Sequence, residues 1–239
     1  GVNGAAANGL TLDFETEHPA GTLIATSQQF DLAAGEARFV HITQQPSTLI
    51  TRETFATAVT VALWDQAANV VTSDSSSVVQ VRLFNNQDEL AVATSGQPAL
   101  GDIPATAVNG EVTFTGLGYA VAPGVGYYLQ FDFSGYTVNS STFTVLPGVA
   151  TSIAIDTEPS TTVSGGLVKT GELLSVQPRV SLFDQDGYLA TTTTGTVTAS
   201  ASNGGNLSEG ATTATVANGS AQFDGVKLVG IPAQNGVAA

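Results

Sequence analysis

Short runs in which apolar and polar residues alternate recur along the chain and predict β-strands. In residues 57–63 the apolar side chains at positions 59, 61 and 63 are separated by smaller or polar ones, and residues 78–83 alternate in the same way. A period of two places the apolar side chains on one face of an extended strand. Similar runs occupy residues 112–114, 127–133 and 142–145. No segment of about ten residues has the period of a helix, so we expect an all-β fold.

Turn-forming residues separate these runs. The pairs are Ala68-Asn69, Asn85-Asn86, Asn109-Gly110, Pro123-Gly124 and Ser134-Gly135. Gly, Pro and Asn favour turns because they adopt or preset the backbone angles that turns require. The spacing of strands and turns is typical of a β-sandwich.

The sequence repeats itself at intervals of about 110 to 120 residues. ARFVHITQQ followed by Pro46-Ser47 matches TSIAIDTE followed by Pro159-Ser160, and VTVALWDQ, which ends at Gln66, matches PRVSLFDQ, which ends at Gln185. Asn-Gly pairs begin at positions 109 and 218, and each leads to a phenylalanine. The interval drifts by a few positions from motif to motif, as loop insertions and deletions between two copies of one domain produce.

A third, partial copy lies at the start of the chain. Leu12-Asp13-Phe14 matches Leu129-Gln130-Phe131, and Gln29-Phe30-Asp31-Leu32 matches Thr142-Phe143-Thr144-Val145. We expect residues 1–35 to be the last two strands of a preceding or strand-exchanged repeat. Residues 36–148 would then form a complete sandwich, and residues 149–239 a sandwich that lacks its last strands. The chain would be either a slice of a longer array or a subunit whose two ends pair between molecules.

Seven or so short strands in about 110 residues predict an immunoglobulin-like Greek-key β-sandwich for each of the tandem repeats. The motif order is Gln-Pro-Ser or Glu-Pro-Ser, an aromatic residue with Asp-Gln, a threonine seven positions past that Asp, Asn-Gly-x-x-x-Phe, and Thr-Phe-Thr-Val. The threonines are Thr72 and Thr191. This order resembles the bacterial immunoglobulin-like repeats of cell-surface proteins and adhesins of the invasin and intimin type. The resemblance implies an extracellular, secreted stalk, fibre or lattice protein, and it implies no catalytic residue.

The charge narrows the range of partners. Lys and Arg total 6 and Asp and Glu total 20, which gives a net charge of −14 over 239 residues. Such a chain is repelled by the phosphate backbone, so we expect no nucleic-acid partner. No apolar run approaches the roughly 18 residues that a membrane-spanning helix needs, so we expect no direct membrane insertion. With no cysteine the chain forms no disulfide and has no thiol chemistry.

Few residues could support catalysis or bind a metal. His18 and His41 have no neighbouring Cys and no second His at metal-binding spacing, so a zinc site is not expected. The chain has no Gly-x-Ser-x-Gly elbow and no nucleotide-binding fingerprint. We therefore predict that it is not an enzyme and has no catalytic, cofactor-binding or metal-binding residues.

Calcium is the alternative that the sequence leaves open. Asp184-Gln185-Asp186-Gly187 has the alternating carboxylates of some oxygen-ligand loops, yet a calcium ion needs six or more oxygens. The other interpretation of this run is a polar turn after a strand. Further carboxylates near the repeat junctions are Glu36, Asp156 and Glu158.

Aromatic residues are expected to fill the cores. We predict that Trp64, which stands where the later repeat has Phe183, packs into the core near one end of the sandwich. Tyr127 and Tyr128 are adjacent, so in a strand one should face inward and the other outward.

Three functions are compatible with these observations. The first is a structural stalk, filament or lattice, in one form assembled head-to-tail by strand complementation between residues 1–35 and 149–239. The second is an adhesin that recognises a glycan or a protein through its loops, the longest candidate being residues 85–109. The third is a spacer within a larger secreted enzyme. The partners would be other copies of the chain, adjoining repeats or a cell-surface ligand.

Overall fold

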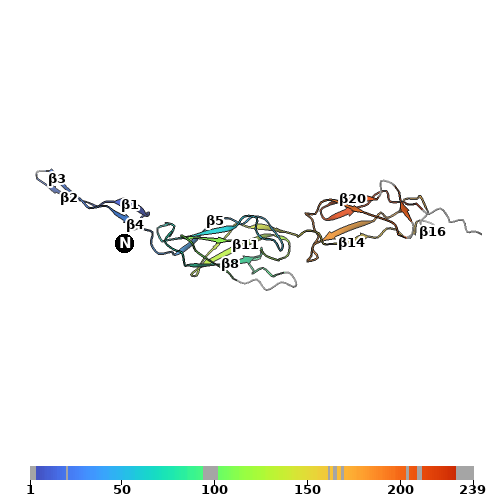
Figure 1. Ribbon diagram of the computed structural model, residues 1–239, viewed down its shortest axis with the longest axis horizontal. Helices are drawn as coiled ribbons and strands as arrows, with labels where there is room; N and C mark the ends of the chain where they lie inside the picture. The colour runs from blue at the N-terminus through green and yellow to red at the C-terminus, as the bar shows by residue number, and fades with distance from the viewer. Residues whose placement is uncertain are drawn as a thin grey trace, which may run out of the picture.

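The computed structural model is all-β and describes residues 4–19, 21–93, 102–160, 162–163, 166–167, 170–202, 205–208 and 212–229. Three parts follow one another along an elongated molecule (Figure 1). We name them the N-terminal arm (residues 4–32), the central sandwich (residues 37–147) and the C-terminal module (residues 149–229). Within the described residues, no helix is long and apolar enough to cross a lipid bilayer.

The described residues of the N-terminal arm form two strand pairs and contribute no residue to a hydrophobic core. β1 (Ala7–Leu10) pairs with β4 (Phe30–Leu32), and β2 (Asp13–His18) pairs with β3 (Gly21–Thr26), both antiparallel. All of β3 is exposed to solvent.

The central sandwich has two sheets. In one sheet, β7 (Val59–Trp64) lies between β5 (Phe39–Gln44) and β10 (Glu111–Phe114). The other has the order β6 (Leu49–Ile50), β13 (Phe143–Leu146), β11 (Gly124–Phe133), β8 (Val78–Phe84) and β9 (Ile103–Thr106), with β12 (Tyr136–Asn139) also paired to β11. β6 and β13 are parallel, and the other pairs of this part are antiparallel.

The inner faces of the two sheets form one apolar core. The predicted alternation is confirmed on β7, where Val59, Val61 and Leu63 are fully buried, and on β8, where the same holds for alternate residues. The rings of Phe114 on β10 and Phe131 on β11 lie 5.3 Å apart across the sheets. Burial of this much apolar surface is the main stabilising contribution to the sandwich.

Trp64 corrects one prediction. Its position on β7 alternates with the buried residues, so its ring lies on the outer face of the sheet. There it stacks on His41 at a centroid distance of 4.5 Å instead of packing into the core. The prediction for the adjacent tyrosines is confirmed, because Tyr127 packs against the core while Tyr128 stacks on Phe84 at the surface.

The C-terminal module has a sheet path with the order β14 (Ser152–Thr157), β17 (Arg179–Phe183), β21 (Ser220–Gln222), β20 (Thr213–Ala217) and β18 (Thr196–Thr198). Two short pairs accompany it: β15 (Thr162–Val163) with β16 (Gly166–Leu167), and β19 (Asn206–Leu207) with β22 (Leu228–Val229). Its described core is small, and seven buried residues form it.

The predicted turn at Asn109-Gly110 is present, and the equivalent Asn218-Gly219 pair in the later repeat forms the same turn. Asn109 and Gly110 have φ values of 52° and 76°, and Asn218 and Gly219 have 49° and 75°. Two successive positive φ values define the tight hairpin turn whose twist matches that of paired strands. A side chain at Gly110 would lie 2.5 Å from the carbonyl oxygen of Val71, so close approach also requires glycine there.

Candidate functional site

The two segments that connect the three parts are held by buried carboxylates. Asp65, directly after β7, is 5% exposed, and Asp184, directly after β17, is 4% exposed. One oxygen of each shapes its own turn. Asp65 Oδ1 accepts hydrogen bonds from the N–H groups of Ala67 and Asn69, and Asp184 Oδ1 accepts from those of Asp186 and Tyr188, all at 2.8 to 3.0 Å.

The second oxygen of each carboxylate binds the preceding linker. The N–H of Gly35 donates to Asp65 Oδ2 at 2.8 Å, and the N–H of Gly148 donates to Asp184 Oδ2 at 2.9 Å. We call these two bonds the linker clamps. A buried carboxylate needs such partners, because leaving it unpaired would be costly. Each clamp therefore ties a connecting segment to the part that follows it.

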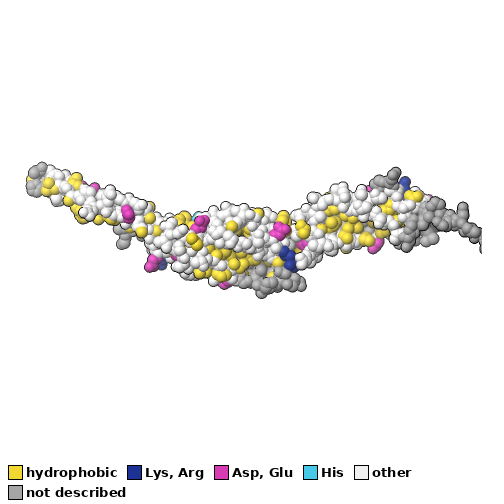
Figure 2. Space-filling model, viewed as in Figure 1, with side chains coloured by type: hydrophobic (Ala, Val, Ile, Leu, Met, Phe, Trp, Pro, Cys, Tyr) yellow, Lys and Arg dark blue, Asp and Glu magenta, His cyan; other side chains and the backbone are white. Residues whose placement is uncertain are grey.

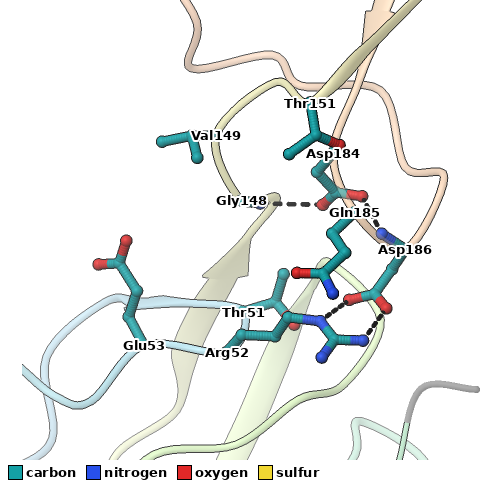
Figure 3. Close-up of a pocket in the computed structure, with 9 residues that line it drawn as sticks. All are labelled: Thr51, Arg52, Glu53, Gly148, Val149, Thr151, Asp184, Gln185 and Asp186. Carbon is teal, nitrogen blue, oxygen red and sulfur yellow. Dashed lines mark hydrogen bonds and ion pairs between the residues drawn. The ribbon is translucent and has the colours of Figure 1, made fainter. Parts of the chain in front are cut away.

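An ion pair adds to the second junction. Arg52, in the turn after β6, reaches the C-terminal module and binds Asp186 with two nitrogens, one of them Nε at 2.7 Å from Oδ2 (Figure 3). The side chain of Asp186 is 6% exposed. The hydrogen bonds that Arg52 donates to Asp186 raise the pKa of the Arg52 guanidinium. A bidentate pair fixes orientation as well as distance, so this contact restricts rotation between the two parts.

A shallow pocket marks this junction. Its lining comprises Thr51, Arg52, Glu53, Gly148, Val149, Thr151, Asp184, Gln185 and Asp186, which belong to both sides of the joint (Figure 3). The hydrogen bonds described above already engage two of the three carboxylates of the pocket, Asp184 and Asp186. The geometry is that of a joint between two modules.

The first junction uses an amide in place of the ion pair. Ala67 stands where the second junction has Asp186, and Asn69 contacts the N-terminal arm. The amide of Asn69 donates to Asp65 Oδ2 at 2.9 Å and to the carbonyl of Gly4 at 3.2 Å, and its oxygen accepts from the N–H of Ala6. The hydrogen bonds from the Asn69 side chain and N–H, followed by that from Gly35, lower the pKa of Asp65 to about 2.

The structure places the run that suggested calcium in this second junction. Asp184 and Asp186 belong to a turn after a strand, with Gly187 at a φ of 82°, and N–H groups and Arg52 engage their oxygens. Asp156, also named as a possible ligand, accepts the hydroxyl of Ser181 on β17. Within the described part of the chain, no three His, Asp or Glu side chains form a group that could hold a metal. Calcium binding stays an untested alternative.

The remaining sequence candidates do not gather into one site. His41 lies on the outer face of β5 against Trp64. His18 is the last residue of β2, and its side chain falls outside the described residues. In the candidate binding loop, residues 94–101 also fall outside them. In its described part, Asn85 Oδ1 accepts the N–H groups of Gln87 and Glu89, which repeats the turn built on Asp65.

From the sequence, the Asp-Gln pair at Asp184 is either part of a calcium loop or a polar turn, and the bond from each Asp to the preceding linker glycine is not predicted. The available signal was that the pair follows a strand in both repeats and that Gly35 and Gly148 recur at the same interval as the flanking motifs. Arg52 could not have been identified in this way, because no equivalent arginine occurs in the later repeat. No protein-family model matches this chain, and no curated protein is significantly similar to it in sequence.

Proposed function

We propose that this chain is a structural segment of an extracellular stalk, filament or lattice, built from tandem immunoglobulin-like β-sandwich repeats. The repeats would span residues 36–148 and 149–239, with residues 1–35 supplying the closing strands of another repeat. The protein works by holding a fixed, extended shape, and it carries out no chemistry.

The observation that carries this proposal is the recurrence of the linker clamp. Gly35 with Asp65 and Gly148 with Asp184 form the same hydrogen bond at both connections. Few residues link the parts, so without such bonds the connections would bend freely. A rigid connection repeated along the chain is what a stalk or filament requires, whereas a globular enzyme has no need of it.

The pattern of sheet pairing supports the repeat interpretation. β14, β17 and β21 pair in the order of β5, β7 and β10, and β18 with β20 matches β8 with β9. Bridges after the equivalent turns also recur, as Trp64 with Val70 and Phe183 with Leu189. The absence of cysteine and the acidic charge fit an exposed surface protein, since the charge keeps it soluble and repels nonspecific contacts.

The stiffness of the second junction tests this function. We expect electron micrographs of single molecules to show a narrow distribution of angles between the central sandwich and the C-terminal module. Arg52→Ala should broaden it at least twofold, because the ion pair to Asp186 is lost. Arg82→Ala is the matched control, since Arg82 forms a similar bidentate pair with Asp102 inside the central sandwich.

The same measurement has a clear opposing outcome. If the unsubstituted chain already bends over a wide range of angles, the junction does not set the shape and a structural role is wrong. If Arg82→Ala broadens the distribution as much as Arg52→Ala, the effect does not come from the junction.

A further inference from the structure

The N-terminal arm pairs its strands in the register of two strands of the central sandwich. β1 with β4 corresponds to the first half of β11 with β13, and both pairings contain a register shift at the same place. The equivalent pairs are Ala7–Leu32 with Gly124–Val145, and Leu10–Phe30 with Tyr127–Phe143. Both strands of the pair lie one repeat interval before their counterparts in the sequence.

The second half of the arm also pairs its strands in the register of the central sandwich. β2 with β3 corresponds to the rest of β11 with β12, since Phe14 faces Ala25 as Phe131 faces Val138. Side-chain bonds recur too. The N–H of Leu12 donates to Ser27 Oγ at 2.9 Å, and the N–H of Leu129 donates to Ser140 Oγ at 3.0 Å. The arm thus has the backbone geometry of a sandwich's closing strands.

Among the residues of the arm that the structure describes, none belongs to a core that these strands could close. Phe14 is 63% exposed, Leu12 53% and Phe30 42%. The equivalent residues of the central sandwich, Phe131, Leu129 and Phe143, are 0%, 0% and 7% exposed. Exposed apolar side chains grouped along the arm mark an interaction surface.

The described strands of the C-terminal module leave one edge of its sheet path unpaired. β8 is paired on both sides, by β9 and by β11, whereas its counterpart β18 lies at the edge of its sheet path with β20 as its neighbour. An apolar groove runs beside it, and Figure 2 shows a patch of apolar side chains on the visible face of this part. The groove is lined by core residues of the module, including Leu174, Val180, Ala199, Phe223 and Val226.

The groove residues correspond to residues that touch β11 and β13 in the central sandwich. Phe223 is the counterpart of Phe114, whose ring packs against Phe131. Leu174 is the counterpart of Phe55, whose ring lies 5.2 Å from that of Phe143. On β14, Ile153 is 54% exposed, while its counterpart Val40 on β5 is 3% exposed.

We infer that the arm of one copy of this chain inserts into the groove of the C-terminal module of another copy. The inference rests on the proposed structural function and names its partner, a second copy of the same chain. β2 would lie antiparallel to β18 and add a strand to its edge, as in other forms of β-strand addition. Phe14, Leu12 and Phe30 then enter the positions that Phe131, Leu129 and Phe143 fill in the central sandwich.

The joint forms between molecules because of the molecule's shape. The arm and the C-terminal module lie at opposite ends of the elongated chain (Figure 1), and the clamp from Gly35 to Asp65 holds the linker that follows the arm. A head-to-tail contact of this kind does not close on itself, so it produces an open fibre.

The equivalences also define the register of the joint. β11 pairs with β8 through Phe131–Val81, Gln130–Arg82 and Leu129–Leu83. Transferred to the joint, the predicted pairs are Phe14 with Ala199, Asp13 with Ser200, and Leu12 with Ala201. Asp13 and Ser200 would face each other on the outer side of the sheet. Residues that are paired directly across antiparallel strands have Cα atoms about 5 Å apart, a separation that a disulfide can span.

Site-directed disulfide formation tests this register, and the chain has no cysteine of its own to interfere. Full-length chains with Asp13→Cys are mixed with chains carrying Ser200→Cys and oxidised. We expect a heterodimer, identified by mass spectrometry, in at least fivefold higher yield than with Ser202→Cys, which lies two positions out of register. Equal yields from the two mixtures, or no heterodimer in either, would overturn the inference.

Sedimentation at rising concentration provides an independent readout. The unsubstituted chain should form head-to-tail oligomers, and Phe14→Asp should raise the concentration needed at least tenfold. Ile24→Asp is the matched control, because Ile24 is also 63% exposed in the same hairpin but pairs with Glu15 and faces away from the groove. Monomers at every concentration, or equal effects of the two variants, contradict the inference.

These outcomes are separable from those for the proposed function. If single molecules are stiff but the disulfide between positions 13 and 200 never forms, the proposed structural role stands and the proposed joint between copies is wrong. If the molecules are flexible but still cross-link in register, the joint between copies stands and the proposed rigid stalk is wrong.

Discussion

Single residues decide how the parts of this chain are connected. A carboxylate after a strand is usually explained as a solvated turn residue, yet Asp65 and Asp184 are both nearly buried and use both oxygens. One oxygen shapes the turn and the other holds a linker glycine. At Asp65 the arrangement favours the ionised carboxylate, because that form accepts hydrogen bonds at both oxygens and donates none.

Acid should release the first clamp. Asp65 has a pKa of about 2 in the folded chain, below its ordinary value of 3.8, so its ionised form stabilises the fold above about pH 4. That contribution is lost as the pH falls from about 4 through 2. The amide resonance of Gly35, followed by NMR, should titrate with a midpoint near pH 2. The titration should be absent in Asp65→Asn, and a midpoint near 4 would show that the clamp does not form.

Glycine positions provide a second prediction at this scale. Gly110→Ala should destabilise the central sandwich by about 2–4 kcal/mol, because it combines a left-handed backbone with a clash against Val71. Gly187→Ala should cost only about 1–2 kcal/mol, since Gly187 has positive φ but open space around it. Urea unfolding of the two variants measures the difference. Equal losses would mean that the close approach to Val71 contributes nothing.

At the scale of strands, two equivalent strand pairs differ in how far their apolar side chains are buried. The second half of β11 and β2 share their register and their supporting serine bonds, yet one is buried and the other exposed. Backbone pairing therefore does not determine whether the apolar face of a strand pair is covered. The presence of a facing sheet determines it.

Truncating equivalent phenylalanines should reveal this contrast. Phe131→Ala removes a fully buried ring and should destabilise the central sandwich by about 3–5 kcal/mol. Phe14→Ala should change the thermal unfolding of dilute monomers by less than about 0.5 kcal/mol, since its ring is mostly in solvent. Thermal melts at low concentration make the comparison. A large loss for Phe14→Ala in monomers would mean that the arm has a core within the chain.

At the scale of the whole molecule, charge opposes assembly while apolar surface favours it. The chain carries a net charge of −14, so two copies repel each other at long range. At physiological ionic strength, salt screens this repulsion at separations beyond about 8 Å but leaves apolar contacts in place.

Raising the salt concentration should therefore promote association. Between about 10 and 150 mM salt, where the screening length falls from about 30 to 8 Å, light scattering should report oligomers at a lower protein concentration. The Phe14→Asp variant should not respond in the same range. A fall in association with salt would indicate that ion pairs, not apolar insertion, hold the copies together.

Much of the architecture follows from local pattern. Alternating apolar residues identify the buried faces of β7 and β8, and the Asn109-Gly110 pair identifies a tight turn. These features depend on neighbouring residues and on backbone geometry, so the sequence suffices to predict them. The repeat intervals also indicated which segments should correspond, because equivalent strands keep their spacing.

Only the tertiary structure decided which distant residues the side chains of these sequence patterns contact. Trp64 was assigned to the core, but its place in the alternation of β7 puts it outside, against His41 on β5. The partners of Asp184 and Asp186 come from Gly148 and Arg52, 36 and 134 residues away. Such contacts arise from how the chain folds back on itself, and no short-range pattern encodes them.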